Sequence, residues 1–426
     1  MEASARYALI GVTGYGRTHL RLIESQIRAG KGGLQAATVI NPSEAAEEVA
    51  RLRRLGCRIY GDYAEMLERE SGKIDLCLIP TGIAWHARMA AAALSSGCSA
   101  LIEKPAAATV AEVEAMERVE RQTGLFVAVG FQHFYHPAVR TLQRRIRRGD
   151  LGTVREIKIG CVWPRPRAYY RRNAWAGRLR CKDGWVLDSP VNNAMAHFLM
   201  LGLALAGASG DSGHVRAVEA ELYRAQAIES FDTFSLRAEL DGGGRIWFWG
   251  SHSAREALPP LIEIRGSKGS AVILPDERIT LELDGRKETS AMDGKSSLNA
   301  MMRSVTARIF DPTKPVCTLA MAKEHTRIVN ALHRHFPVHQ LGTGDLLAHD
   351  LRGSETIIIP DINEMILRAF HGPRHLSQCG AAWGQASSAV SMDRREEPLI
   401  PTPPEEATLL RPNAKTQNNF GIPASI

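Results

Sequence analysis

The sequence predicts an α/β protein of two domains: a doubly wound parallel sheet at the N-terminus, then an α+β domain with a large, mostly antiparallel open sheet. Three observations support this prediction. The chain has 426 residues, more than one ordinary hydrophobic core holds. Up to about residue 131, apolar strand-like runs alternate with helical patterns. After about residue 136, strand-like runs follow one another with turns between them.

The first domain is predicted over residues 1–135. Its apolar runs are typical of strands buried on both faces, and the segments between them carry apolar residues at three-to-four spacing and often stop at Gly. Strands are expected at 7–12, 34–40, 74–80, 99–105 and 126–132, and helices at 16–30, 43–56, 63–70, 84–97 and 109–124. Alternation of this kind predicts five parallel strands with helices on both faces.

The second domain is predicted over residues 136–386. Its strand-like segments lie at 153–163, 215–225, 232–240, 244–252, 261–275 and 278–283. From residue 387 the chain loses periodicity and fills with Pro, Ser and charge. Residues 387–426 are therefore expected to be disordered or loosely docked, because they carry too little apolar surface to offset the entropy of ordering.

Composition narrows the class of protein. An apolar fraction of 44% and a charged fraction of 23% are those of a soluble globular protein. The net charge of +7 is spread along the chain without a nucleic-acid-binding motif, and no run of about 18 apolar residues occurs, so neither a nucleic acid nor a membrane partner is expected. The N-terminus carries no signal-peptide pattern, and seven scattered cysteines without C-x-x-C fit the cytoplasm. His333-x-His335 lacks a third ligand at suitable spacing, so no metal site is expected.

A glycine turn joins the first strand to the first helix. Gly11-x-Thr13-x-x-Gly16, with Gly14 and Tyr15 between, occupies the place of a dinucleotide-binding G-x-G-x-x-G. Such a turn in a Rossmann domain offers helix N–H groups to a pyrophosphate. We therefore predict NAD or NADP as the cofactor. Thr13 departs from the pattern, and either its Cβ pushes the cofactor outward or its hydroxyl donates to a phosphate oxygen.

The second predicted strand ends at Asn41, where many dinucleotide-binding folds place an acid that binds the adenosine ribose. The missing carboxylate removes one objection to a 2′-phosphate, but Asn41-Pro42-Ser43 supplies no arginine to hold one. The sequence therefore leaves NAD and NADP open, and a simple turn at Asn41 is the alternative.

The fourth predicted strand ends in "ALIEKP", which places Glu103 and Lys104 at its carboxyl end. Ligands of doubly wound sheets bind beyond the carboxyl ends of the strands, so Lys104 is expected to point toward the ligand. An isolated Glu-Lys pair at a strand end is otherwise more often a surface salt bridge.

The segment at 80–116, which contains this strand end, resembles the glucose-fructose oxidoreductase / inositol dehydrogenase / rhizopine-catabolism (Gfo/Idh/MocA) family. The matching positions are Pro80-Thr81-Gly82, His86, Gly97 and Glu103-Lys104-Pro105, with further similar stretches at 14–20, 129–139, 149–159 and 262–273. The resemblance implies a nicotinamide-dependent enzyme with Lys104 at the nicotinamide and the substrate hydroxyl. It places Glu103 in the cofactor site, with Thr81 and His86 beside it. It also implies a homo-oligomer, a dimer or tetramer, formed through the C-terminal sheet.

The family's segment Asp-x-Gly-x-His-x-x-Asp matches here with substitutions. Asp188 falls on the first Asp and Asn192 on the His, and an amide cannot take a proton. Asn193 and His197 share a helix face, and His197 is the nearest imidazole. We list Asp188, Asn192 and His197 with Lys104 as catalytic candidates and Asn193 as substrate-binding. The alternative for His197 is a packed core residue.

An aromatic and basic stretch at 163–178 precedes that segment. Aromatic faces stack on sugar rings, and guanidinium groups bind carboxylate or phosphate. Its candidates for substrate binding are Tyr169, Tyr170, Arg172, Asn173 and Trp175. The alternative is a long ordered loop packed on the first domain, and the two interpretations are compatible.

The sequence thus predicts an NAD(P)-dependent oxidoreductase that transfers a hydride to or from a sugar, cyclitol or related polyol. One alternative is an NAD-dependent enzyme without net redox, which oxidises transiently, eliminates and re-reduces. The other is a catalytically silent nucleotide-binding sensor or partner subunit, because fold alone does not fix function.

Overall fold

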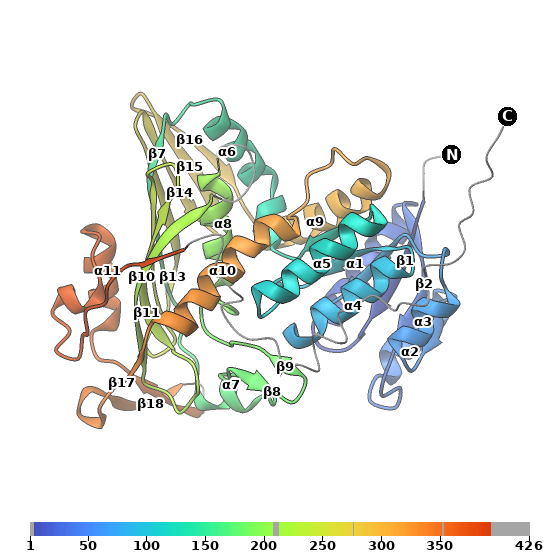
Figure 1. Cartoon of the computed structure of the whole chain (residues 1–426), viewed down its shortest axis with the longest axis horizontal. Helices are drawn as coiled ribbons and strands as arrows, with labels where there is room; N and C mark the ends of the chain where they lie inside the picture. The colour runs from blue at the N-terminus through green and yellow to red at the C-terminus, as the bar shows by residue number, and fades with distance from the viewer. Residues whose placement is uncertain (1–3, 208–212, 276, 352, 393–426) are drawn as a thin grey trace.

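The computed structural model describes residues 4–207, 213–275, 277–351 and 353–392. It contains two sheets that lie side by side, with the parallel sheet at the right of Figure 1 and the large sheet at the left. Helix α10 (Leu319–His335) runs from one to the other. Both predicted sheet types are therefore confirmed.

The first sheet has six parallel strands among the described residues, in the order β3-β2-β1-β4-β5-β6. They are β1 (Ala5–Ile10), β2 (Gly32–Thr38), β3 (Arg58–Tyr60), β4 (Leu76–Ile79), β5 (Ser99–Ile102) and β6 (Val127–Val129). The prediction of five strands missed β3. That strand is three residues long, lies at the sheet edge and is not fully buried, so it carries no apolar run.

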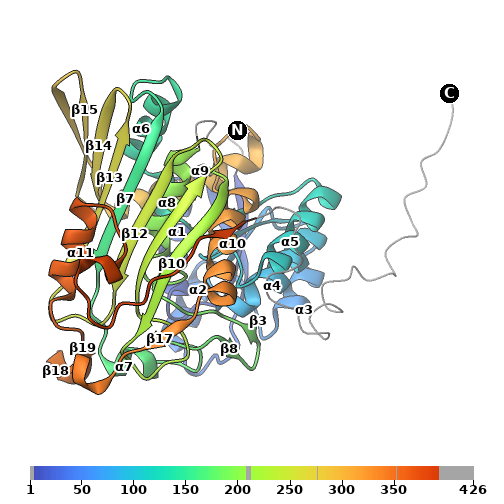
Figure 2. The ribbon, with the colours of Figure 1, turned by 60° about the vertical axis from the view of Figure 1, so that its left-hand side comes forward.

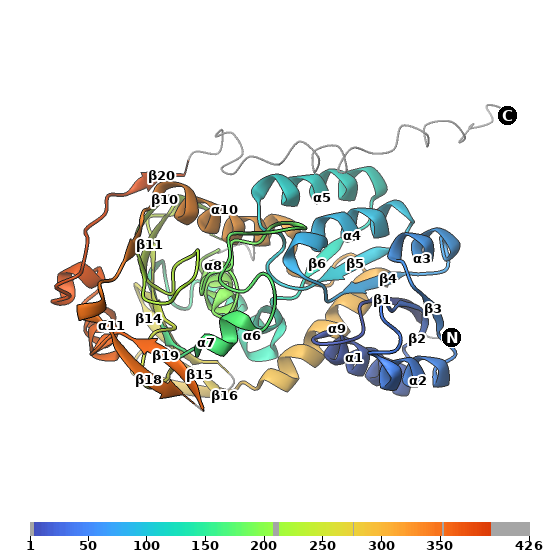
Figure 3. The ribbon, with the colours of Figure 1, turned by 90° about the horizontal axis from the view of Figure 1, so that it is seen from below.

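Helices cover both faces of this sheet (Figure 3). They are α1 (Gly16–Arg28), α2 (Ala46–Arg54), α3 (Tyr63–Arg69), α4 (Ile83–Ser95) and α5 (Val110–Thr123). Strands β4 and β5 are buried along their whole length, as their unbroken apolar runs predict. The strand order reverses direction between β1 and β4, and a ligand crevice forms at such a point beyond the carboxyl ends.

The second sheet has ten strands among the described residues, and its order is β16-β15-β14-β13-β7-β12-β11-β10-β17, with β20 beside β10. They are β7 (Val154–Val162), β10 (Val215–Arg224), β11 (Thr233–Leu240), β12 (Arg245–Ser251), β13 (Leu258–Gly266), β14 (Gly269–Leu274), β15 (Arg278–Leu283), β16 (Arg286–Ala291), β17 (Val338–Gln340) and β20 (Val390–Ser391). Only the β7–β12 and β10–β17 pairs are parallel, so the sheet is mostly antiparallel.

Two details of this sheet differ from the prediction. The run at 261–275 is a hairpin of two strands, which turns at Ser267 and Lys268. Strand β16 was not predicted because every one of its residues is exposed, which leaves no alternation of apolar and polar side chains.

Helices pack on the two faces of the large sheet (Figure 2). The apolar helix α8 (Ala196–Ala206) packs against β7, and α11 (Ile362–His371) packs against β7 and β12. Under α11, Phe370 contacts Trp249 with ring centroids 6.0 Å apart. The smaller elements are η1 (Gln132–Tyr135), α6 (Pro137–Arg147), α7 (Arg167–Arg171), β8 (Arg180–Cys181), β9 (Gly184–Trp185), η2 (Thr343–Asp345), β18 (Leu347–Leu351), β19 (Ser354–Ile358) and η3 (Leu376–Cys379).

Two helices that follow the large sheet in sequence tie the sheets together. Helix α9 (Gly294–Phe310) packs on η1 and α1, and the hydroxyls of Tyr7 and Thr306 lie 3.0 Å apart. Helix α10 packs on α5 and α8, and Asn330 binds both the N–H of Val110 and the carbonyl of Ala108. These contacts fix the two sheets relative to each other.

The structure describes the start of the predicted tail. Val390–Ser391 pair with β10, Met392 is buried, and Arg327 donates to the Met392 carbonyl at 2.7 Å. Residues 390–392 are thus docked, while the rest of the predicted tail, 393–426, lies outside the described residues. The domain boundaries at 135 and 386 stay predictions. Among the described residues, no helix has the length and apolarity to cross a membrane.

Candidate active site

The glycine turn between β1 and α1 has the shape that a dinucleotide requires. Gly11 has φ +87°, a left-handed conformation that favours glycine. A Cβ on Gly16 would lie 2.3 Å from the Gly11 carbonyl oxygen, so helix and strand approach too closely for any side chain. Thr13, Gly14 and Tyr15 are exposed at the tip of the turn. The first turn of α1 has no acidic residue, which leaves its positive end open to a phosphate.

The end of β2 carries Asn41 and Glu44 side by side. The Asn41 amide donates to the Glu44 carboxylate at 3.3 Å. Ile40, just before them, is 78% exposed, an unusual place for a large apolar side chain. Arg17 lies at the start of α1, but its guanidinium is ion-paired with Glu48 at 2.5 Å. The segment after β2 therefore presents the apolar side chain of Ile40 and the carboxylate of Glu44, and the nearby Arg17 is already ion-paired.

Glu103 is held from both sides at the end of β5. His19 Nε2 lies 2.8 Å from Glu103 Oε1, and the Lys104 N–H donates to Oε2 at 3.3 Å. A Cβ on Gly130 would lie 2.9 Å from Oε1, so the end of β6 leaves room for this carboxylate. Tyr15 connects this cluster to the glycine turn, because its ring lies 5.7 Å from that of His19.

His86 joins the two loops that follow β4 and β5. Its Nε2 lies 3.1 Å from the Thr81 carbonyl and its Nδ1 2.9 Å from the Pro105 carbonyl. The neutral ring donates to one of these oxygens, and burial lowers its pKa. The hydroxyl of Thr81 points to Met89 Sδ at 3.6 Å. His86 thus holds the loops after β4 and β5 in place.

Lys104 contacts the second domain. Its Nζ donates to the Asn193 carbonyl at 2.8 Å and to the Asn193 Oδ1 at 3.1 Å. The Asn193 Nδ2 donates in turn to Asp188 Oδ1 at 2.8 Å. Asp188 Oδ2 accepts the Gly177 N–H at 2.6 Å. Lys104 and Asp188 are therefore linked through Asn193 and not directly.

Burial and charge shift the protonation of these groups. Burial lowers the pKa of Lys104, and the positive Arg172 adds to this shift, while Glu103 and Asp188 oppose it. Burial raises the pKa of Asp188, although its hydrogen bonds from Gly177 and Asn193 favour the charged form. A lysine with a lowered pKa releases its proton more readily than an ordinary lysine does.

Asn192 does not reach Lys104. Its side chain is 1% exposed, and its Nδ2 donates to the carbonyls of Val186 and Leu187 at 3.0 and 3.2 Å. Leu187 has φ +49°, a strained conformation for a branched residue, and it directly precedes Asp188. Asn192 thus holds the backbone that places Asp188, and its neighbour Asn193 contacts the lysine.

His197 lies in an imidazole cluster behind Lys104. Its ring centroid is 5.3 Å from that of His133 and 5.9 Å from that of Phe131, and His325 is 5.4 Å from Phe131. Burial holds the pKa of His197 well below 6.5, and the charge on Lys104 adds to the effect. His197 is therefore neutral at pH 7. No hydrogen bond joins it to Lys104 or Asp188 among the described residues, and its catalytic role stays a prediction.

The basic stretch at 163–178 divides into two groups. Arg172 lies 3.6 Å from the Tyr169 ring centroid and 5.1 Å from that of Trp175. Trp175 packs with Ile83 and Ala108 of the first domain, so these three side chains lie near the contact between the two domains. Tyr170 and Asn173 instead line a different cavity. The segment is thus both an ordered loop and a set of polar and aromatic side chains near Asp188.

Sequence reasoning missed His19, His133 and His325. His19 had a local signal, because it follows Gly16 by three residues and faces the sheet from the first turn of α1. His325 had none, because α10 reaches the site only through tertiary packing. Across the described ranges, no three His, Cys, Asp or Glu side chains gather as a metal site would require.

Comparison with known proteins follows the same division into two domains. Residues 5–131 match the model of the oxidoreductase family with an NAD-binding Rossmann fold, and residues 139–272 match the GFO/IDH/MocA C-terminal domain. D-apiose dehydrogenase of Paraburkholderia graminis is 26% identical over 67% of this chain and 72% of its own length. scyllo-Inositol 2-dehydrogenase (NAD(+)) of Bacillus subtilis is 30% identical over 36% of this chain and 43% of its own length.

Solved structures agree on the fold. The WlbA dehydrogenase from Bordetella pertussis, in complex with NADH and UDP-GlcNAcA, superimposes with a TM-score of 0.65 at 19% identity, over 78% of this chain and 96% of that one. KijD10, a 3-ketoreductase from Actinomadura kijaniata solved with NADP and TDP-benzene, gives a TM-score of 0.63 at 17% identity, over 80% of this chain and all of that one. With both family models matched in chain order, the chain belongs to the Gfo/Idh/MocA family of NAD(P)-dependent oxidoreductases.

Proposed function

We propose that the protein transfers a hydride between a nicotinamide cofactor and a carbinol carbon of a sugar or cyclitol, with Lys104 as the proton-transferring residue. The observation that carries this proposal is the position of Lys104. It lies at the carboxyl end of β5, in the ligand crevice, with a lowered pKa and a fixed amine.

The bound nicotinamide supplies the hydride chemistry, and the protein's residues handle the proton. In the oxidising direction, the neutral Lys104 amine takes the proton of the substrate hydroxyl. The Asn193 carbonyl and amide oxygens accept hydrogen bonds from Nζ and orient it, and these bonds strengthen when the amine becomes an ammonium. Asp188 then offsets the new positive charge through Asn193. Reduction runs through the same groups in reverse.

The end of β2 supports NAD over NADP. A 2′-phosphate there would meet the Glu44 carboxylate beside Asn41, and Arg17 is already paired with Glu48. A ribose hydroxyl instead finds acceptors in these side chains, and the exposed Ile40 offers an apolar surface to adenine. We expect NAD(H) to bind at least about tenfold more tightly than NADP(H), since like-charge contact is unfavourable.

Polyhydroxylated substrates are supported by Tyr169, Arg172 and Trp175 at the border of the crevice. Relatives of this chain carry the names of apiose and inositol dehydrogenases, which fits the same class. We also propose a cytoplasmic location and a homo-oligomer formed through the large sheet. The seven free cysteines support the first.

The test is a screen of candidate substrates in which absorbance at 340 nm is measured. Purified protein is incubated with NAD⁺ or NADP⁺ and a panel of aldoses, uronic acids, inositols and glycosides, after mass spectrometry of any nucleotide that co-purifies. Growth of absorbance with at least one polyol supports the proposal. Binding of NAD(H) with no turnover of any panel member favours the silent sensor, and consumption of a glycoside without net absorbance change favours the enzyme without net redox. If the protein binds none of NAD⁺, NADH, NADP⁺ and NADPH, the oxidoreductase assignment is contradicted.

A further inference from the structure

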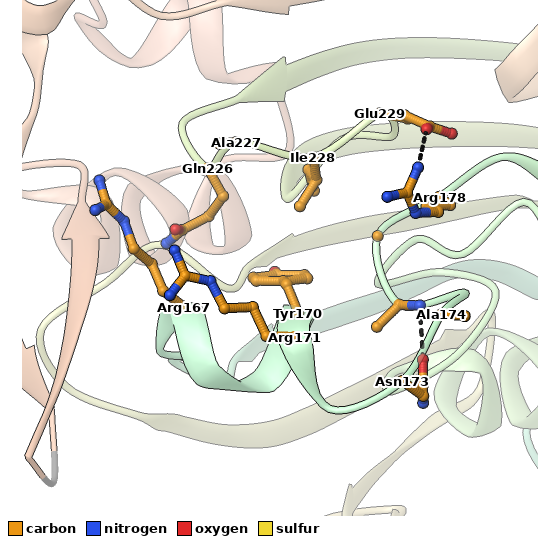
Figure 4. Close-up of a pocket in the computed structure, with 12 residues that line it drawn as sticks. Arg167, Tyr170, Arg171, Asn173, Ala174, Arg178, Gln226, Ala227, Ile228 and Glu229 are labelled. Atoms are coloured by element: carbon orange, nitrogen blue, oxygen red, sulfur yellow. Dashed lines mark hydrogen bonds and ion pairs between the residues drawn. The ribbon is translucent and has the colours of Figure 1, made fainter.

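A cavity lies beside the candidate active site and plays no part in the mechanism above. It has a volume of about 750 Å³, large enough for a small organic ligand. Its walls come from α7 and the loop after it, and from the turn between β10 and β11 (Figure 4). Lys104, Asp188 and Asn193 are not among its lining residues.

Three arginines and one acid, Glu229, line this cavity. Arg167 and Arg171 lie on one side, with Gln226, and Arg178 lies on the other (Figure 4). Arg167 pairs with Glu355 at 2.6 Å, and Arg178 pairs with Glu229 at 2.9 Å. The Arg171 guanidinium makes no hydrogen bond or ion pair with any residue that the structure describes. It is thus a free cation at the edge of a concave site, as binding of an anion requires.

The cavity also contains a buried acceptor. Gln226 is 1% exposed, and its Nε2 donates to Ser253, Thr356 and the Ile357 carbonyl, which fixes the orientation of the amide. Its Oε1 has no hydrogen-bond partner among the described residues. Asp232 accepts the N–H groups of Ala225 and Gln226 at 2.9 and 2.7 Å, so the turn that carries the amide is preorganised.

A buried acceptor without a partner is costly, and a ligand hydroxyl would satisfy it. The hydroxyl of Tyr170, which also lines the cavity, is likewise buried without a partner among the described residues. The site thus combines cations with groups that exchange hydrogen bonds with hydroxyls. That combination matches one molecule with both an anionic group and hydroxyl groups.

One wall of the cavity is shared with the candidate active site. Gly177 lines the cavity, and its N–H donates to Asp188 Oδ2 at 2.6 Å. Its carbonyl accepts the N–H of Glu229, which lines the opposite wall. A Cβ on Gly177 would lie 2.6 Å from Ile228 Cγ2, so the backbone here packs too closely for any side chain. A ligand in the cavity would therefore lie one backbone segment away from Asp188.

We propose that this cavity, lined by Arg167, Arg171, Arg178, Tyr170 and Gln226, binds the phosphate or carboxylate of a hydroxylated small molecule, with Arg171 as its free cation. The anion has two sources that share this chemistry: the far end of the substrate, or a separate molecule bound beside it. Binding itself does not depend on the redox chemistry proposed above.

The test is calorimetric titration of D-glucose 6-phosphate, with D-glucose as the neutral probe, into protein saturated with NADH so that the glycine turn is filled. We expect the phosphorylated sugar to bind and glucose to bind at least about tenfold more weakly, because a charge-assisted hydrogen bond is lost. Arg171→Gln should weaken binding of the phosphate by roughly tenfold or more, and Arg171→Lys by less. Arg118→Gln removes an exposed charge from α5 and should change nothing.

Equal affinity of wild type and Arg171→Gln for D-glucose 6-phosphate overturns the proposal, and so does absence of binding. Arg171 is exposed, so its substitution should leave the fold intact, and melting curves check this. If NADH does not bind, the comparison of the Arg171 variants still decides the site, while the proposed function fails separately. Once a substrate is known, turnover is measured with added inorganic phosphate. If phosphate raises only the KM of the substrate, the cavity binds the anionic end of the substrate itself. If phosphate changes kcat, the cavity binds a separate ligand.

Discussion

The two sides of the candidate active site are held in different ways. On the cofactor side, the Gly11–Gly16 turn and the Glu103–Lys104 pair each follow directly from the strand before them. On the substrate side, Lys104 depends on Asn193, which is 89 residues away, and Asp188 depends on a hydrogen bond from a loop. The cofactor side is thus set by local backbone geometry, and the substrate side by packing between the domains.

The largest expected effect tests the local side. Gly11→Val should abolish binding of NAD(H), because it adds a side chain to the turn and forces a branched residue to φ +87°. Gly30→Val is the matched control, since Gly30 has φ +71° at the end of α1 with nothing within 4 Å of its added Cβ. Both variants carry strain of about 1–3 kcal/mol, but only Gly11→Val should lose the nucleotide in fluorescence titrations. Equal loss of nucleotide binding in both variants would show that backbone strain alone, and not the shape of the Gly11–Gly16 turn, controls binding.

The next largest effect tests the substrate side, which depends on packing between the domains. Asn193→Ala removes the link between Lys104 and Asp188 and should lower kcat by roughly 10- to 100-fold, the value of a hydrogen bond to a charged group. Affinity for NAD(H) should stay the same. Asn192→Ala is the neighbouring control, and it should lower the melting temperature more than Asn193→Ala because it releases two backbone carbonyls. A fully active Asn193→Ala enzyme would show that the link is not used.

His197 offers a smaller effect and a test of the proton carrier. Its pKa lies well below 6.5, so a limb due to His197 would appear only in the acidic range. The neutral amine of Lys104 instead accumulates as pH rises through its lowered pKa, so kcat for oxidation should rise with pH and level off below pH 10.5. His197→Gln should lower kcat less than about tenfold and keep that limb. Loss of the limb in His197→Gln would assign the proton to the imidazole.

The smallest effect lies far from the site. A chain that ends at residue 386 should melt about 2–4 °C below one that ends at 392, because β20 and the buried Met392 contribute on the order of 1 kcal/mol. Turnover of the two should be equal. Identical melting temperatures would mean that the pairing of Val390–Ser391 with β10 adds no stability.

The same contrast explains what the sequence predicted. The Rossmann strands and the glycine turn were predictable because buried parallel strands are unbroken apolar runs and a left-handed turn needs glycine. Strand β3 was missed because an edge strand of three residues carries no such run, and β16 because it is polar on both faces. Lys104 was identified from its place at a strand end together with a family resemblance.

The substrate side resisted prediction for a physical reason. Alignment put Asn192 at the position of the proton carrier, but Asn192 binds the Val186 and Leu187 carbonyls, and Asn193 contacts Lys104 instead. His133 and His325 come from elements that meet His197 only in the folded chain. Side-chain direction after an irregular turn is a tertiary property, and residue spacing alone does not encode it.

The most direct test of the account is Lys104→Met, at the point where the two sides meet. We expect kcat for polyol oxidation at 340 nm to fall by about 100- to 10,000-fold, the usual contribution of a general base, while the affinity for NADH changes less than about threefold. Met has a similar length and no charge, so the crevice should remain filled. A Lys104→Met enzyme that turns over at the wild-type rate would contradict the central claim that Lys104 carries the proton.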